Sequence, residues 1–295
     1  MRVLVAGAAG MLGQDVIGAG RRAGHEMLDY GREQLDIASA DSVAAALERA
    51  APEALVNCAA FTDVDGAERE RERAFAVNAD GVGMLARAAE AAAVPMLHVS
   101  SDYVFDGRAP LATSGTPRAY IESDPTGPLS AYGASKLAGE RQVLDASARH
   151  LVVRSAWLFG LGGRNFVATM LALAGERAAE AGPCAVEVVT DQVGSPTWTG
   201  HLAPALIGLL ERRVTGLAHL AGTGIVSWHG LAVEAFRQAE VACEVRETST
   251  AQMSRPAPRP AFSALESERD DVLPLPPWQD GLAGYLAARA GMIRR

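Results

Sequence analysis

The chain has 295 residues, of which 49% are hydrophobic and 21% charged, and its formal net charge is -8. This length allows one large domain or two closely joined ones, and the acidic balance argues against a nucleic-acid partner. No apolar run approaches the ~18 residues that a membrane-spanning helix needs, so we expect no membrane partner. Cys58, Cys184 and Cys243 lack metal or redox spacing, so we expect all three to be reduced in a cytoplasmic protein.

The chain opens with an apolar run of strand length at residues 2–6, followed by a glycine turn and a predicted helix at residues 12–23. A strand, a glycine turn and a helix in this order are typical of a dinucleotide site, where glycines let the backbone approach a pyrophosphate. A glycine turn without a ligand is the alternative. The motif predicts that the cofactor is bound by Gly7, Gly10, Met11, Leu12 and Gly13.

A second strand is predicted at residues 26–30, and Arg32 follows it. An acidic residue at this point would bind the ribose of NAD, whereas an arginine accommodates the 2′-phosphate of NADP. Arg32 therefore favours NADPH, while Asp29 keeps NADH open.

Two further segments are expected to border the cofactor. Asp36 is predicted to cap the turn into the next helix, with Asp41 as the other cap candidate, and Asp36 and Ile37 are placed beside the adenine. Ala59 and Ala60 follow a third apolar strand, and such small residues let the backbone pass close to a ligand. Tight packing of a strand against a helix is the alternative explanation, and it is compatible with the ligand interpretation that we prefer.

Three residues form a candidate catalytic set. Ser101 ends a fourth strand, and ligands bind at this end of strands in open α/β sheets. Tyr132 and Lys136 lie four residues apart on one face of a predicted helix, and Lys136 is the sole lysine among 27 Lys and Arg residues. The site therefore requires a compact charge rather than an arginine fork. We expect Lys136 to lower the pKa of Tyr132, which would then protonate an alkoxide while Ser101 polarises the carbonyl.

The alternation of strands and helices predicts an α/β fold with a Rossmann-type doubly wound parallel sheet. Residues 1–155 are expected to form the NADP-binding domain, with a strand that returns near residues 216–221. Residues 156–295 are expected to form mainly a smaller, closely joined substrate-binding lobe. The proline- and glycine-containing stretch at residues 106–126 has the length of a functional lid.

The glycine motif, Ser101 and Tyr132-x-x-x-Lys136 together resemble the extended short-chain dehydrogenase/reductase family. Within it the chain is similar to the dTDP-4-dehydrorhamnose reductases, and the similarity covers essentially the whole chain. The strings that carry it are residues 57–65, 100–107, 154–160 and 189–197, with further matches at residues 259–265 and 277–282.

This resemblance implies NADPH-dependent reduction of the C4 ketone of dTDP-4-dehydro-L-rhamnose to dTDP-L-rhamnose. Ser101, Tyr132 and Lys136 would be catalytic, and Lys136 would also hold the nicotinamide ribose. The substrate would be bound by Thr62, Asp102, Tyr103, Trp157, Asn165, Gln192 and Pro196. A ketoreductase of a related dTDP-4-keto-6-deoxysugar, in antibiotic or deoxysugar biosynthesis, is the nearest alternative. A non-catalytic regulatory subunit of the same fold is a further one.

Two departures from the family pattern matter. Gly31 stands where relatives often have Asp before the arginine, which favours NADPH further. The segment at residues 108–122 is longer than is usual in the family, so we expect the lid on the substrate side to differ from that of family members. Some family members are described as magnesium-linked dimers. A homodimer and a dependence on Mg²⁺ both stay open here, and no residue of this sequence is assigned as a metal ligand.

Overall fold

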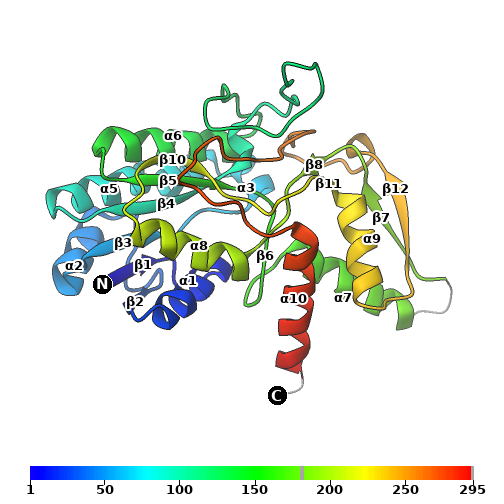
Figure 1. Cartoon of the computed structure of the whole chain (residues 1–295), viewed down its shortest axis with the longest axis horizontal. Helices are drawn as coiled ribbons and strands as arrows, with labels where there is room; N and C mark the ends of the chain where they lie inside the picture. Colours follow the sequence, from blue (N-terminus) through cyan, green and yellow to red (C-terminus); the bar gives the residue numbers. More distant parts are fainter. Residues whose placement is uncertain (180–182, 294–295) are drawn as a thin grey trace.

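The computed structural model describes residues 1–179 and 183–293, and its centre is a six-stranded parallel sheet (Figure 1). The strand order is β10-β5-β4-β3-β1-β2. Parallel strands need both faces covered, which explains their nearly continuous apolar sequences. The strands are β1 (Arg2–Ala6), β2 (Glu26–Tyr30), β3 (Ala54–Asn57), β4 (Met96–Ser101), β5 (Leu151–Ser155) and β10 (Gly216–His219).

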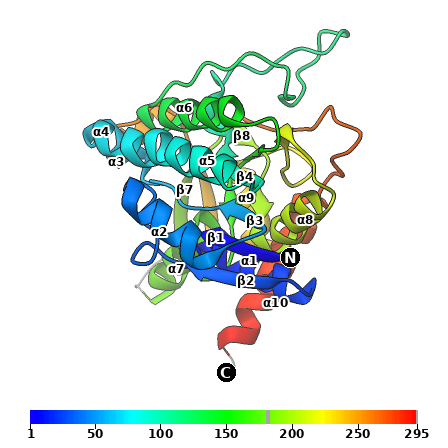
Figure 2. The ribbon, with the colours of Figure 1, turned by 90° about the vertical axis from the view of Figure 1, so that its left-hand side faces the viewer.

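Helices cover both faces of this sheet (Figures 1 and 2). Val3 and Val5 of β1 pack in a core with α1 (Met11–Arg22) and α8 (Thr199–Glu211). The alternate residues Leu4 and Ala6 pack in a second core with α2 (Ala40–Ala50) and α5 (Val82–Ala91), because successive side chains of a strand point to opposite faces. The remaining elements on this side are α3 (Val64–Arg69), α4 (Arg71–Phe75), the π-helix η1 (Ala76–Gly81), the short η2 (Asp102–Val104) and α6 (Ala131–Ala146).

A second group of elements lies beside the sheet and carries its own apolar clusters (Figure 1). It contains β7 (Ala185–Val189) paired in parallel with β12 (Glu244–Thr248). Helices α7 (Phe166–Ala179) and α9 (Trp228–Gln238) pack against this pair, and α10 (Trp278–Ile293) packs against α8 and α9. Short elements connect the two groups: β6 (Leu158–Phe159), β8 (Val193–Gly194), β9 (Thr197–Trp198), β11 (Val226–Ser227) and η3 (Thr250–Gln252).

The sequence located most elements of the sheet correctly. Strands at residues 2–6 and 26–30 are confirmed, and the returning strand exists as β10, which pairs with β5. Helices α7 and α8 were not predicted. Asp36 does close a turn by accepting the Ala38 N–H, but the N-cap of α2 is Ser39 rather than Asp36 or Asp41. None of the helices in the described part of the chain is long and apolar enough to cross a bilayer.

The expectation that all cysteines are reduced is wrong for two of them. Cys184 and Cys243 form a disulfide, while Cys58 is free. The two cysteines immediately precede β7 and β12, whose parallel pairing places their Cα atoms 4.7 Å apart. They are 59 residues apart in the sequence, so their spacing could not reveal that they begin neighbouring strands.

The stretch between Val104 and α6 forms a long loop that projects from the molecule on the α6 side (Figures 1 and 2). Its base is fixed by ionic contacts. Arg118 pairs with Asp124 at 2.6 Å, and the Glu122 carboxylate accepts the backbone N–H of His219 and the hydroxyl of Ser267. The stretch at residues 108–122 is therefore anchored at its C-terminal end to β10 and to Ser267.

The backbones of helix α6 and η1 are in close contact. We therefore expect two Gly→Ala substitutions, one at this contact and one away from it, to change the free energy of unfolding differently. A Cβ on Gly139 would lie 2.0 Å from the carbonyl oxygen of Asn78 in η1, whereas a Cβ on Gly175 of α7 would meet open space. We expect Gly139→Ala to lower the free energy of unfolding by ~1–3 kcal/mol. Gly175→Ala should leave it unchanged or raise it by up to ~1 kcal/mol. Urea denaturation measures both, and equal effects would contradict the close contact.

Candidate active site

The predicted site residues gather at the carboxyl ends of the parallel strands. Gly7 follows β1, the segment containing Ala59 and Ala60 follows β3, and Ser101 ends β4. The carboxyl ends of parallel strands share one edge of the sheet, where ligands bind in open α/β folds. Residues far apart in the sequence are therefore brought together at this edge.

The glycine turn fits a dinucleotide. Gly7 has φ +76°, and a Cβ there would lie 2.6 Å from the backbone nitrogen of Ala59. A Cβ on Gly13 would lie 2.3 Å from the carbonyl oxygen of Gly7. Helix α1 begins at Met11 after Gly10, which supplies no side-chain cap, and no acidic residue lies in its first turn. The N–H groups of that turn are therefore free of a local side-chain acceptor and suit an anion.

The surroundings of β2 favour a phosphate over a free ribose at the adenosine end. Asp29 is the candidate for a ribose, but both of its carboxylate oxygens accept from Arg21 of α1, at 2.9 and 3.0 Å. Arg32 is exposed just beyond the carboxyl end of β2. Ile37 is buried, whereas Asp36 is partly exposed next to it. The guanidinium is thus the group positioned to receive added negative charge.

Helix α6 delivers Tyr132 to the end of β4. Ser130 caps the helix by accepting the N–H of Gly133, and a Cβ on Gly133 would lie 2.2 Å from the carbonyl oxygen of Tyr103. Because α6 approaches this closely, the rings of Tyr103 and Tyr132 meet edge to face with centroids 5.5 Å apart. The Ser101 hydroxyl accepts the Tyr103 N–H and donates to a carboxylate oxygen of Asp102 at 3.0 Å.

The electrostatics of Tyr132 differ from the expectation. Burial raises the pKa of Tyr132 to about 12, and the Asp102 charge acts in the same direction, while the Ser101 hydroxyl partly opposes them. The pKa of Tyr132 is thus raised overall rather than lowered, contrary to the expectation. The Lys136 Nζ atom instead donates to the carbonyl oxygen of Val99 at 2.8 Å. It lies there because the flexible stem of Lys136 bends from α6 onto β4, which the four-residue spacing alone does not determine.

Lys136 is itself unusual, since its side chain is only 2% exposed. Burial lowers the pKa of Lys136 to about 8, although the nearby Glu140 and Cys58 act to raise it. Glu140 in turn is held by Arg154 of β5 at 2.7 Å in a buried ion pair. Lys136 is therefore not an ordinary exposed lysine on a helix surface.

Asp102 carries an oxygen that has no protein partner. Its Oδ2 atom is buried without a hydrogen bond, as are the hydroxyls of Ser100 and Ser155, among the described residues. Burial raises the pKa of Asp102 to about 6, against hydrogen bonding by Ser263 and Ser101. Ser263 was not predicted from the sequence. It also accepts the indole N–H of Trp157 at 3.2 Å, so it links two of the predicted substrate residues.

Trp157 adopts a backbone conformation that is uncommon for a bulky residue, with φ +48°. Its indole stacks on that of Trp228, with centroids 3.5 Å apart. Gln192 accepts the Trp228 indole N–H at 3.2 Å and donates to Thr250, so this predicted substrate residue positions the tryptophan pair. Outliers of this kind cluster at functional sites, and none is visible in a sequence.

The other predicted substrate residues occupy three different environments. Asn165 caps the first turn of α7 by accepting the Ala168 N–H, and its amide donates to Gly160 at 2.8 Å and contacts the Met11 sulfur at 3.9 Å. It therefore lies against the glycine turn. Pro196 is buried, and Thr62 is exposed in the loop after β3.

An ion pair beside Tyr103 was also missed. Arg259 makes two 2.8 Å hydrogen bonds to the two carboxylate oxygens of Asp65, and the same contacts lower the pKa of Asp65 to about 2. Arg255 approaches the same carboxylate at 3.5 Å. Two guanidinium groups thus lie near residues that are predicted to bind the sugar. Because both arginines are far from Asp65 in the sequence, only the fold brings them together.

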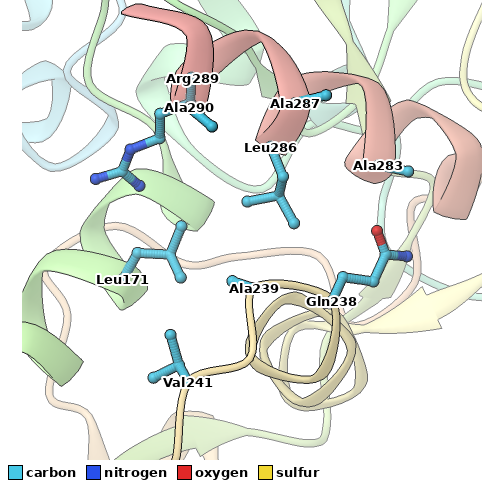
Figure 3. Close-up of a pocket in the computed structure, with 9 residues that line it drawn as sticks. All are labelled: Leu171, Gln238, Ala239, Val241, Ala283, Leu286, Ala287, Arg289 and Ala290. Carbon is cyan, nitrogen blue, oxygen red and sulfur yellow. The ribbon is translucent and has the colours of Figure 1, made fainter. Parts of the chain in front are cut away.

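A hollow of about 650 Å³ lies elsewhere, between α7, α9 and α10 (Figure 3). Leu171, Val241 and Leu286 give it an apolar lining, and Arg289 lies at its margin. No predicted site residue lines it. In residues 1–179 and 183–293, no group of three or more His, Cys, Asp or Glu side chains is arranged to hold a metal ion.

Comparison with known proteins gives one consistent result. The family model for the RmlD substrate binding domain matches residues 1–290. A dTDP-4-dehydrorhamnose reductase of Mycobacterium tuberculosis (strain CDC 1551 / Oshkosh) is 42% identical, over 98% of this chain and 93% of the relative. A Streptomyces antibioticus protein named "Probable dTDP-4,6-dihydroxy-2-methyloxan-3-one 4-ketoreductase" is 40% identical, over 96% of this chain and 93% of the relative. The crystal structure of dTDP-4-dehydrorhamnose reductase from Bacillus anthracis str. Ames in complex with NADP has a TM-score of 0.90 and 32% sequence identity. The match covers 97% of this chain and 99% of that chain.

The buried carboxyl group of Asp102 predicts a pH-dependent stability. Its pKa is raised from 3.8 to about 6, so the folded protein holds this proton more tightly than the unfolded chain does. Ionisation of Asp102 therefore weakens folding as the pH rises from about 4 to about 6, and the penalty stays constant above that range. We expect Asp102→Asn to be more stable than the unmodified chain above pH ~6, by up to ~3 kcal/mol, and to lose this advantage below pH ~4. Denaturation curves across this range measure the difference, and a constant difference would contradict it.

Proposed function

This chain belongs to the RmlD substrate binding domain family, and we propose that it reduces the C4 ketone of dTDP-4-dehydro-L-rhamnose to dTDP-L-rhamnose with NADPH. The observation that carries the proposal is the arrangement of Ser101, Tyr132 and Asp102 at the sheet edge that also holds the glycine turn. Identity of 42% to a named reductase over nearly the whole chain supports the substrate. We also propose that residues 1–155 form the NADP-binding domain and that residues 156–295 form mainly the substrate-binding lobe.

Bound NADPH would supply the hydride. The Ser101 hydroxyl would turn its hydrogen from Asp102 to the substrate carbonyl oxygen and so orient it, and Tyr132 protonates the oxygen as negative charge develops there. A phenol with a pKa near 12 stays protonated until that charge appears, which suits a proton donor. The unpartnered Oδ2 of Asp102 can accept a sugar hydroxyl, and the stacked Trp157 offers an apolar wall for the hexose. Proton transfer of this kind contributes ~10²–10⁴-fold to the rate.

The choice of NADPH over NADH rests on the groups around β2. Asp29 is engaged by Arg21, so its carboxylate is not available for a ribose without breaking that pair. Arg32 is exposed beyond the strand, and the homologue from Bacillus anthracis was solved with NADP. Both support the phosphorylated cofactor.

A ketoreductase acting on a related dTDP-4-keto-6-deoxysugar is the second candidate. The 40% identity to the Streptomyces antibioticus protein favours it, and it would use the same catalytic residues. Incubation of the protein with NADPH and each keto sugar, followed by NMR identification of the product, separates the two. The sugar that is reduced faster identifies which of the two activities the protein has. Absence of turnover with every dTDP-4-keto sugar would exclude both activities.

Tyr132→Phe tests the proton donor. We expect turnover to fall by ~10²–10⁴-fold, because the phenol hydroxyl is the group that protonates the product oxygen. NADPH binding, followed by fluorescence quenching, should change little. Tyr285→Phe removes a hydroxyl from a tyrosine buried against Phe159, outside the site, and should retain normal turnover. Near-normal turnover of the Tyr132 variant would refute its assignment.

Arg32→Ala tests the cofactor. The loss of a guanidinium contact to the 2′-phosphate should raise the KM for NADPH by ~10-fold or more, with little change for NADH. Arg49→Ala removes an exposed charge from α2 and serves as the control for net charge. If Arg32→Ala affected both cofactors equally, the 2′-phosphate contact would be wrong.

A further inference from the structure

Beneath the glycine turn and Tyr132, buried polar side chains form a chain of contacts that the proposed mechanism does not use. Asn57 ends β3, His98 lies in the middle of β4, and Lys136 reaches them from α6. Asn57 and His98 are completely buried, and Lys136 is nearly so. Water therefore cannot satisfy these groups, and each hydrogen must find an acceptor within the chain.

The direction of every hydrogen bond follows from one backbone group. The Ala59 N–H donates to Oδ1 of Asn57 at 3.0 Å, so the amide nitrogen of Asn57 must be the atom that faces His98. That nitrogen lies 3.0 Å from Nδ1 of His98 and can only donate. Nδ1 is therefore the acceptor, and the neutral ring carries its hydrogen on Nε2.

The Nε2 hydrogen in turn faces Lys136, whose Nζ atom is 3.4 Å away and donates to the Val99 carbonyl at 2.8 Å. An ammonium group has donors only, so two donors would oppose each other here. An amine has a lone pair that accepts from Nε2 and still donates to Val99. The contacts are all satisfied only when Lys136 is neutral.

We propose that His98 is a positioning residue that stabilises the neutral amine form of Lys136 and thereby sets the upper pH limit of the reaction. An uncharged Lys136 lacks the charge that would stabilise the phenolate that Tyr132 leaves behind, so turnover requires the protonated form of Lys136. The kinetic part of this inference rests on the proposed reductase activity. The protonation state of Lys136 does not.

The other titratable groups around Lys136 agree with this arrangement. Cys58, after β3, is a neutral thiol because burial raises its pKa to about 12, and the phenol of Tyr132 on α6 is also neutral. Glu140, one turn along α6, is the nearby carboxylate that favours the ammonium, but Arg154 engages it at 2.7 Å. Burial lowers the pKa of His98 well below its ordinary value, so the ring itself stays neutral.

The chain offers a direct test, because Lys136 is its only lysine. In protein made with ¹³C-labelled lysine, a single set of side-chain NMR signals reports the titration of Lys136 without assignment. We expect a pKa well below the ~10.4 of an ordinary lysine. In ¹⁵N-histidine spectra, His98 should show the tautomer with hydrogen on Nε2. A Lys136 pKa near the ordinary value, or the opposite tautomer of His98, would overturn the proposal, and both are measured on the unmodified protein.

His98→Gln supplies the functional arm. The glutamine oxygen can accept from an ammonium, so the Lys136 pKa should rise by about one unit or more, and the alkaline limb of kcat/KM should move by the same amount. His150→Gln is the matched control, since His150 is equally buried but bonds to Met96 and Ala86, away from Lys136. An unchanged Lys136 titration in the His98 variant would overturn the proposal. A shifted titration in a protein that reduces no dTDP-4-keto sugar would support the hydrogen-bond assignment and refute the proposed function instead.

Discussion

The site depends on how closely α6 packs against the end of β4 and against η1. Gly133 lets the helix meet the Tyr103 carbonyl, and Gly139 lets it meet the carbonyl of Asn78, each at a distance that a Cβ would not allow. Between these two contacts lie Lys136, which reaches β4, and Ser135, which accepts the amide N–H of Asn78. A helix held one side-chain layer further out could not bring Tyr132 to Ser101. Backbone proximity, achieved by two glycines, is therefore the constraint on which the other contacts depend.

This close packing has an electrostatic consequence. It buries Tyr132, Asp102 and Lys136 together, and burial shifts the pKa of each toward its neutral form: upward for the two acids and downward for the lysine. Tyr132 therefore stays protonated near neutral pH, whereas the pKa values of Asp102 and Lys136, about 6 and about 8, lie on either side of neutrality. Negative charge that develops on a substrate oxygen would then be stabilised by these buried groups, because little water is present to solvate it.

The part of the molecule beside the sheet contributes in a different way. Trp157, Trp228, Gln192 and Ser263 come from four separate segments, and hydrogen bonds join Gln192 and Ser263 to the two stacked indoles. These contacts make a rigid apolar wall near Asp102, whereas the cofactor side is made largely of backbone. Variation in such loop residues would change the sugar that is accepted without altering Ser101 or Tyr132. This agrees with 40–42% identity to relatives whose names differ in substrate.

The sequence predicted the sheet and the cofactor turn well because both depend on local patterns. Apolar runs of strand length, a glycine spacing that only a tight turn requires, and a four-residue Tyr–Lys spacing are each contained within a few residues. The single lysine could be singled out from the sequence because a composition count needs no structure, and its side chain is buried in the fold.

What only the tertiary structure decided was the partner of each side chain. Lys136 was expected to act on Tyr132, but its Nζ atom contacts His98 and Val99, because a flexible stem can bend toward either neighbour and the sheet supplies the free carbonyl. The disulfide of Cys184 and Cys243 required the parallel pairing of two strands that are distant in the sequence. Residue types, spacing and composition thus determined which groups are candidates for the chemistry. Their charges and contacts were set by burial and by long-range packing, which no local pattern contains.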